Sequence, residues 1–371
     1  MHITREQVTA KLKYLPLLLI LCIHHFLRFY NARSLSKSFE SAVGGNGGIN
    51  DTFWYLGIAH HGYNFAPAGA NAHQSAWAFY PLWPNLVAVG RHIGIPAVWW
   101  GLILVTVVAF LAAIQLSRLV SMHFSSRVGY ICAILFVGQL YALSLISIMT
   151  ESLFALIAFT ALIAWQKRQY NQVGLLIILA CLTKSFGLAL ALTFFIAILI
   201  KIRKSELNLN QVLFPFLACV FSPLIWISLV ALHFQNVRAY FDIQRQGWGN
   251  EFNVGGAFTR FIFESIINLQ ESTSWELIVV LVACLTLGLV TWAMVFPVPI
   301  EWKIFILATA YMSIAHRSWH IADARFMTSI GLCLFPIAVS LEKFRPILRN
   351  TFLVCWLIPG FYLSSIALSG F

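Results

Sequence analysis

The sequence predicts an all-α polytopic membrane protein. Of its 371 residues, 60% are hydrophobic and only 10% are charged, so a soluble domain of this length would have too little interior to hide its apolar side chains. Apolar runs long enough to cross a hydrocarbon core of about 30 Å as helices recur along the whole chain. Basic residues gather between alternate runs, as they do in the cytoplasmic loops of membrane proteins.

The apolar runs define about eleven spans. The first follows Arg5, Lys11 and Lys13 as a signal peptide would, but it is long and lacks a small-residue cleavage site, so we expect a retained helix. No polar stretch is long enough for a separate soluble domain, so residues 1–371 are predicted to form one integral-membrane domain. The predicted spans are 14–30, 95–117, 128–149, 152–165, 172–183, 186–200, 209–232, 275–296, 302–316, 326–341 and 351–370.

The distribution of charge places the N-terminus in the cytoplasm. With this orientation, more than half of the 24 lysines and arginines lie on the cytoplasmic side, but fewer than a third of the 13 acidic residues do. A basic face of this kind reflects topology and contact with anionic lipid. It gives no indication of nucleic-acid binding.

Residues 172–200 can be interpreted in two ways, as one tilted span or as a hairpin that turns at Thr183-Lys184-Ser185. A single span would place Lys184 in the middle of the membrane. It would also distribute the basic residues almost evenly over the two faces. The hairpin keeps the basic cluster from Lys201 to Lys204 in the cytoplasm, so we favour it. Its short arms place Lys184 below the outer surface, where a lysine needs an anionic partner or a wet cavity.

Two outer segments are long enough to build a site. The first, about 31–94, contains a glycine-rich stretch, a short aromatic helix that begins near Asp51 and a second helix near Pro84. The second, about 233–274, contains an amphipathic stretch at 258–269 whose apolar stripe suits a helix in the interface plane. An acidic residue on a short helix beside the membrane makes Asp51 the first candidate for chemistry.

The sequence indicates neither metal nor redox chemistry. The seven cysteines fall inside predicted spans without ligand spacing, so we interpret them as packing residues. His60, His61 and His73 lack a clean ligand spacing on one helix face, which disfavours a metal site. His316 and His320 have the spacing of a helical pair, but they lie in a turn that need not be helical. No cofactor is therefore predicted.

An ordered set of short motifs runs along the outer segments. Asp51, Trp54 and Tyr55, followed by Ile58-Ala59 and Gly62-Tyr63, are similar to the Trp-Asp-x-x-Trp-Tyr…Ile-Ala-x-x-Gly-Tyr motif of the GPI mannosyltransferase II family and its prokaryotic relatives. Further stretches resemble later motifs of that family in the same order. These are Phe79–Pro84, Thr150–Phe154, Thr183–Gly187, the pair Gln244 and Trp248, and Arg325-Phe326.

The chain departs from the family pattern at two positions. Asn50 stands where the family has a tryptophan before the acid, which puts acceptor contacts in doubt. Lys184 stands where the family has an arginine. Because lysine acts as a point charge, the bidentate phosphate contact that an arginine makes is not expected there.

The resemblance implies a C-type glycosyltransferase, a multispanning enzyme with juxtamembrane helices on its outer face. Such an enzyme uses a polyprenyl-phosphate sugar, typically mannose, on the outer or lumenal face. Its partners would be this donor, a lipid-linked or glycan acceptor and the membrane lipids. The membrane would be a bacterial cell membrane or, in a eukaryote, that of the endoplasmic reticulum.

The residues themselves suit this chemistry. Asp51 can act as a general base for the acceptor hydroxyl, and Lys184, Arg325 and Arg317 can stabilise the leaving phosphate. The residues expected to contact substrate are Trp54, Tyr55, Glu151, Gln244 and Trp248.

Simpler interpretations stay open. Asp51 can be a helix N-cap, Glu151 can pair with a local cation, and Asp323 can pair with Arg325 or Arg317. Tryptophans near span ends often anchor a protein at the membrane interface. The alternative function is a transporter or flippase for a lipid-linked sugar, which needs the same groove and cations but no acid on an outer helix.

Overall fold

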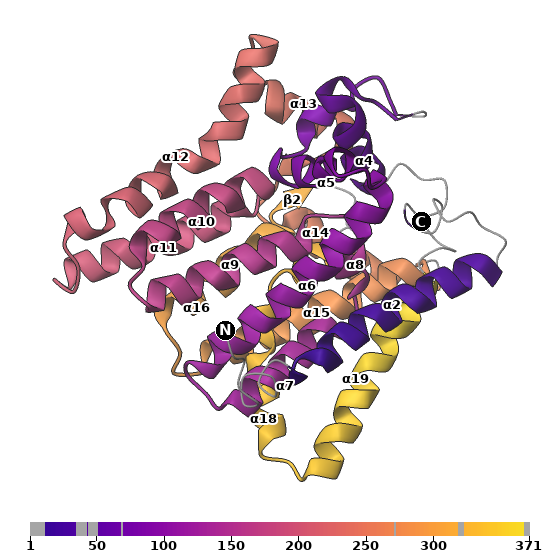
Figure 1. Ribbon diagram of the computed structural model, residues 1–371, viewed down its shortest axis with the longest axis vertical. Helices are drawn as coiled ribbons and strands as arrows, with labels where there is room; N and C mark the ends of the chain where they lie inside the picture. The colour runs from indigo at the N-terminus through magenta and orange to yellow at the C-terminus, as the bar shows by residue number, and fades with distance from the viewer. Residues whose placement is uncertain are drawn as a thin grey trace.

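The computed structural model of the protein describes residues 12–34, 43, 51–67, 70–270, 272–317 and 323–366. Its long helices run in a common direction (Figure 1). The short helices α4 (Asp51–His61), α5 (Leu82–His92) and α13 (Ala239–Trp248) gather at one end of this bundle. The glycine-rich stretch before Asp51, residue 50 and His320 lie outside the described residues.

Five helices in the described part of the chain are long and apolar enough to cross a membrane. Many of their apolar side chains point away from the protein, including Leu19, Ile103 and Leu281, each about half exposed. Such surfaces suit contact with lipid, and the chain is an integral membrane protein. The five are α2 (Leu15–Ser34), α6 (Ala97–Ser121), α12 (Leu209–Phe234), α15 (Ser274–Met294) and α19 (Pro346–Ile366).

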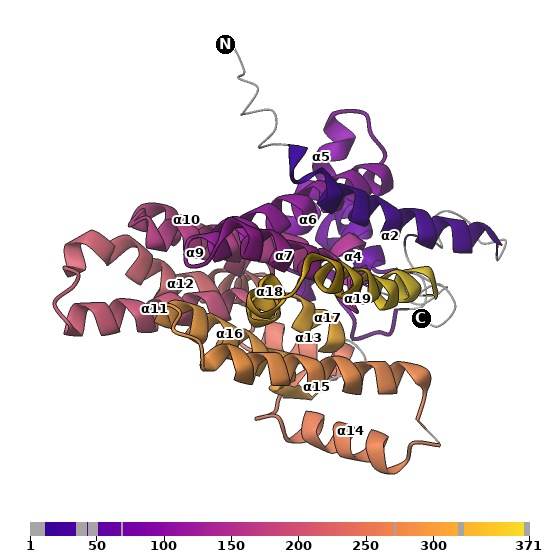
Figure 2. The same cartoon turned by 90° about the horizontal axis from the view of Figure 1, so that it is seen from below.

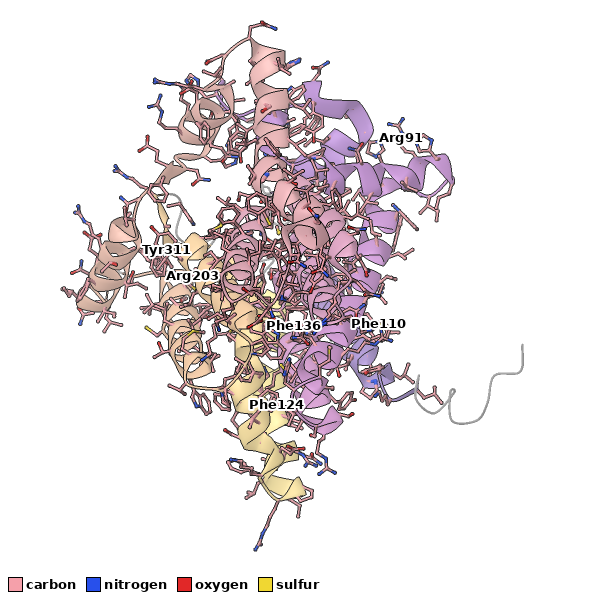
Figure 3. The ribbon with its side chains drawn as sticks, turned by 90° about the vertical axis from the view of Figure 1, so that its left-hand side faces the viewer. Arg91, Phe110, Phe124, Phe136, Arg203 and Tyr311 are labelled. Atoms are coloured by element: carbon pink, nitrogen blue, oxygen red, sulfur yellow. The ribbon has the colours of Figure 1, made fainter. Side chains whose placement is uncertain are left out.

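Shorter apolar helices fill the space between these five, and the number of spans stays a prediction. They pack through large buried rings such as Phe136, Phe154 and Phe159. Figure 3 shows Phe136 in the middle of the molecule, with Arg91 of α5 near one end and Phe124 near the other. The shorter helices are α7 (Ser126–Val137), α9 (Glu151–Gln166), α10 (Tyr170–Thr183), α11 (Gly187–Arg203), α16 (Ile300–Ile314), α17 (Asp323–Thr328), η4 (Gly331–Leu334) and α18 (Phe335–Glu342).

The structure interrupts two of the predicted spans. In the first, 128–149, α7 (Ser126–Val137) ends and the short helix α8 (Leu143–Ile146) follows after a turn. At this turn α19 passes so close that a Cβ on Gly360 would lie 2.9 Å from the carbonyl oxygen of Gly138. The second interrupted span, predicted at 326–341, divides into α17, η4 and α18. Hydropathy misses both interruptions because an apolar run stays apolar whether or not the helix continues.

The predicted hairpin is present, because α10 and α11 are separate helices joined by a tight turn. Lys184 has an extended backbone there, with φ −168° and ψ 166°. A Cβ on Gly187 would lie 2.4 Å from the Cα of Cys181, so the turn requires a glycine at this position. Both arms pack against α12 (Figure 1). The alternative of one tilted span is therefore wrong.

The outer segments form the short helices that the sequence predicts near Asp51, near Pro84 and at 258–269. Strands β1 (Glu251–Phe252) and β2 (His316–Arg317) pair antiparallel and connect the segment around α14 to the segment after α16. Figure 2 shows α14 beside α15 at the edge of the molecule. The helices are α4 (Asp51–His61), α5 (Leu82–His92), α13 (Ala239–Trp248) and α14 (Gly256–Ile267), and η2 (Ala76–Ala78) is a single 3-10 turn.

Candidate active site

Four charged side chains meet where α4 joins the helix bundle. Asp51 is the first residue of α4, Glu151 is the first residue of α9, Lys184 lies in the α10–α11 turn, and Arg325 lies in α17. These segments are far apart in the sequence, so only the fold brings the four residues together. We call them the charged cluster.

Arg325 links the two carboxylates of the charged cluster. Its Nη1 lies 2.7 Å from Oδ2 of Asp51, and its Nε lies 3.4 Å from Oε1 of Glu151. Lys184 Nζ lies 3.1 Å from the same Glu151 oxygen. Glu151 is thus the anionic partner that the predicted depth of Lys184 in the membrane calls for. Two cations and two carboxylates leave the cluster formally neutral.

Burial divides the charged cluster into an inner and an outer pair. The side chains of Glu151 and Lys184 are 2% and 8% exposed, whereas those of Asp51 and Arg325 are 24% and 17% exposed. Charges buried as deeply as the inner pair are tolerated only with partners. Asp51 and Arg325 therefore keep some exposed surface, while Glu151 contacts both cations inside the fold.

Two phenylalanine rings cover the cations. Lys184 Nζ lies 4.6 Å from the ring centre of Phe186 and 5.0 Å from that of Phe326, and Arg325 Cζ lies 4.7 Å from that of Phe326. The face of an aromatic ring attracts a cation without neutralising it, so the rings themselves leave the charge of both groups available to an anion. Sequence reasoning did not assign these rings to the site. The sequence did contain a signal for them: Phe186 follows Lys184 by two residues, and Phe326 follows Arg325 directly.

Tyr55 fixes α4 against the segment that precedes α9. Its hydroxyl is hydrogen-bonded to the side chain of Thr150. Burial, together with the negative charges of Asp51 and Glu151, raises the pKa of Tyr55 well above its usual value, so the phenol stays neutral. Met149 lies beside Thr150, and its Sδ is 3.6 Å from Arg325 Nη1. Sequence reasoning assigned neither Met149 nor Thr150 a role.

Asp51 has an ion-pair partner outside its own helix. It lies in the first described turn of α4. Its carboxylate pairs with Arg325, and the N-terminal end of the helix dipole favours a negative charge in this turn. The ion pair is thus one cause of the orientation of the carboxylate, and a capping role for Asp51 stays a prediction.

The tryptophans predicted to contact sugar belong to a packed aromatic group. Trp54 has no exposed surface; its ring stacks on Phe79 at 5.4 Å and meets the edge of Trp248 at 5.6 Å. The complete burial of Trp54 favours packing over sugar stacking. Trp248, at the end of α13, is only partly buried and is the ring of this trio better placed for a ligand.

The remaining candidates lie around the charged cluster. Gln244 donates to the carbonyl of Ala78 at 3.1 Å and so attaches α13 to η2. Arg317 is exposed on β2, and no ion pair among the described residues joins it to the cluster. Asp242 pairs with Arg245 at 3.2 Å on α13. The side chain of Asp323 lies outside the described part of the structure.

Solved structures with a similar fold are membrane enzymes. ArnT from Cupriavidus metallidurans, bound to undecaprenyl phosphate, has a TM-score of 0.56 at 12% identity, covering 92% of this chain and 62% of that chain. The Archaeoglobus fulgidus oligosaccharyltransferase has a TM-score of 0.50 in its apo form, and 0.52 when tethered with an acceptor peptide containing the NVT sequon, both at 12% identity. These comparisons cover 96% of this chain and 55% and 54% of those chains. This chain thus spans less than two thirds of each, and the similarity shows the fold of a C-type membrane glycosyltransferase.

A sequence comparison gives the family. The family model described as mannosyltransferase (PIG-V) matches residues 16–254, and the chain belongs to this family. The match confirms the resemblance of the motifs around Asp51. It includes three members of the charged cluster and ends before Arg325. No curated protein matches the chain in sequence.

Proposed function

We propose that this protein transfers a hexose, most simply mannose, from a polyprenyl phosphate to a lipid-linked or glycan acceptor. The observation that carries the proposal is the charged cluster, in which an accessible carboxylate and two cations meet at the end of an apolar helix bundle. Membership of the mannosyltransferase (PIG-V) family supports the reaction. The similarity to ArnT, solved with undecaprenyl phosphate, supports the class of donor.

In the proposed reaction the acceptor hydroxyl oxygen bonds to the anomeric carbon of the sugar as the bond from that carbon to the phosphate oxygen breaks. The Asp51 carboxylate takes the hydroxyl proton. Arg325, supported by Lys184, stabilises the charge that develops on the leaving phosphate. Glu151 holds both cations in position. Trp248, Gln244 and Tyr55 are kept as proposed contacts of the substrate, with the partly buried Trp248 the most accessible ring. Arg317, exposed on β2, is kept as a proposed further contact of the donor phosphate.

Product formation tests the proposal directly. Purified protein in detergent, given polyprenyl-phosphate mannose and a lipid-linked glycan acceptor, is expected to form a mannosylated acceptor and an equal amount of polyprenyl phosphate. The matched assay uses protein reconstituted in liposomes with donor on one side. Movement of the donor across the bilayer without product would instead show a transporter or flippase, and would contradict the proposal.

We further propose that the charged cluster faces the outside of a bacterial cell membrane, or the lumen of a eukaryotic endoplasmic reticulum, and that the N-terminus is cytoplasmic. In a variant without native cysteines, Gln244→Cys is expected to react with an impermeant maleimide added from outside, and Arg203→Cys is expected to react only after permeabilisation. Arg203 ends α11 in a basic segment, and Gln244 lies on α13 beyond the next long helix, so the two positions report opposite faces. Labelling of position 203 alone in intact cells would show the opposite topology and contradict this proposal.

A further inference from the structure

A pocket with polar and charged side chains lies away from the charged cluster, at the end of the bundle where α6, α9 and α11 finish and α16 begins. Its volume is about 510 Å³, within the range of pockets that bind small ligands. The residues of its lining that carry the argument are His123, Gln166, Lys201, Lys204, Glu206 and Glu301.

Two polar side chains of this pocket have no hydrogen-bond or ion-pair partner among the described residues. Glu301 is only 6% exposed, and within the described residues its carboxylate takes part in no ion pair or hydrogen bond. Gln166 buries both its side-chain nitrogen and its side-chain oxygen without a hydrogen-bond partner. The positive end of the α16 helix dipole stabilises the negative charge of Glu301. It provides no hydrogen-bond partner for Gln166. Buried polar groups of this kind indicate a missing partner.

The end of α11 supplies positive charge to the pocket. Lys201 pairs with Glu206 at 3.3 Å, whereas Lys204 forms no ion pair with the described residues. The four charged residues of the lining sum to zero, with the unpaired cation on α11 and the unpaired acid on α16. A ligand that bears only negative charge would satisfy Lys204 but meet the carboxylate of Glu301. The complementary ligand carries both a phosphate and an amine.

The surroundings of the pocket favour a lipid over a soluble ligand. Helices α11 and α16 pack against each other. Beyond the pocket they expose Leu192 and Leu199 of α11 and Leu307 of α16, each between 44% and 48% exposed. Apolar side chains in this position contact acyl chains, while a pocket at the ends of the helices lies at the level of the lipid headgroups.

We propose that this pocket binds the headgroup of a phospholipid with a primary amine, of the phosphatidylethanolamine type. The ammonium donates to the Glu301 carboxylate and to Oε1 of Gln166, and the phosphate pairs with Lys204. The acyl chains lie along α11 and α16. This inference rests on the membrane location of the fold and is independent of the proposed transferase activity, so either can fail without the other.

Competition between two lipids tests the site. Full-length protein is purified from equal amounts of phosphatidylethanolamine and phosphatidylcholine, and the lipid it retains is measured by mass spectrometry. The quaternary ammonium of phosphatidylcholine has no N–H to donate. Wild type is therefore expected to retain about tenfold more phosphatidylethanolamine than phosphatidylcholine. Glu301→Gln, which removes the charge at nearly constant size, is expected to bring this ratio close to one. The control Glu264→Gln, an exposed residue on α14, is expected to keep it.

The test depends on the ratio of the two retained lipids in folded protein, so a loss of stability alone does not decide it. If Glu301→Gln does not fold, Gln166→Leu replaces it, because it removes the other acceptor without touching a charge and is expected to reduce the preference as well. Equal retention of both lipids by wild type, or an unchanged preference in the folded variant, overturns the proposal. So does displacement of the lipid by soluble phosphoethanolamine at comparable concentration, which would show a site for a free phosphate ester.

Discussion

Asp51→Asn is expected to lower the rate of glycosyl transfer by about a hundredfold or more, because the amide cannot accept the proton of the acceptor hydroxyl. The fold should survive the change. Asn keeps the size of the side chain and can still accept a hydrogen bond from Arg325, which retains Glu151 as its ionic partner. Because the pair is partly exposed, its loss should cost about 1 kcal/mol or less in unfolding free energy. Initial rates at saturating donor, with thermal unfolding in parallel, measure both effects.

Asp242→Asn is the matched control for this prediction. Asp242 is also an acidic residue on a short helix of the outer segments, and it is also paired with an arginine, Arg245, at 3.2 Å. It belongs to a different pair from the charged cluster, so its variant should transfer sugar within about twofold of wild type. The reverse pattern, a folded Asp51→Asn with full activity and an inactive Asp242→Asn, would assign the base to Asp242.

Lys184→Met is expected to weaken use of the lipid donor by about thirtyfold or more, the effect of losing a charged partner worth roughly 2–5 kcal/mol in a desolvated site. The structure adds a complication, because the same change leaves Glu151 with Arg325 as its remaining cation. The double variant Lys184→Met with Glu151→Gln separates the two effects, since it restores neutrality to the buried pair. If Lys184 binds phosphate, the double variant should stay as poor in donor use as the single one.

Recovery of donor use in that double variant would show that Lys184 serves only to neutralise Glu151, and would remove it from the phosphate site. The comparison pair is Arg260→Met with Glu264→Gln, which deletes an exposed ion pair on α14. Its donor use should match wild type. Titration of polyprenyl-phosphate mannose at fixed acceptor gives the apparent donor affinity for each protein, and size-exclusion profiles show whether each is folded.

The sequence could predict which residues of the charged cluster carry chemistry, but not how they are joined. Hydropathy on both sides of Lys184 set its depth in the membrane, and depth alone required an anion nearby. That this anion is Glu151 depends on how α9 packs against the hairpin. The ion pair between Asp51 and Arg325 joins residues near opposite ends of the chain, and a linear pattern carries no information on such a contact.

Other differences come from properties that hydropathy does not measure. Trp54 looked like an interfacial ring or a sugar platform, because an aromatic residue on a short helix gives the same signal whether it faces solvent or the core. Its burial follows from the docking of α13, which brings Trp248 against it. The break after α7 depends on the close passage of α19 at Gly360, a contact between distant parts of the chain.

The short arms of the hairpin have a consequence for the membrane itself. Helices α10 and α11 have 14 and 17 residues, so at the helical rise they reach only roughly 21 and 26 Å. The hydrocarbon core is thicker, about 30 Å. Since Leu175 and Leu188 on these arms face outward, the lipids beside them must compress to cover the protein. This hydrophobic mismatch lowers the headgroups of one leaflet toward Lys184. A lipid-borne phosphate could then approach the charged cluster sideways from the bilayer, without first being lifted out of it.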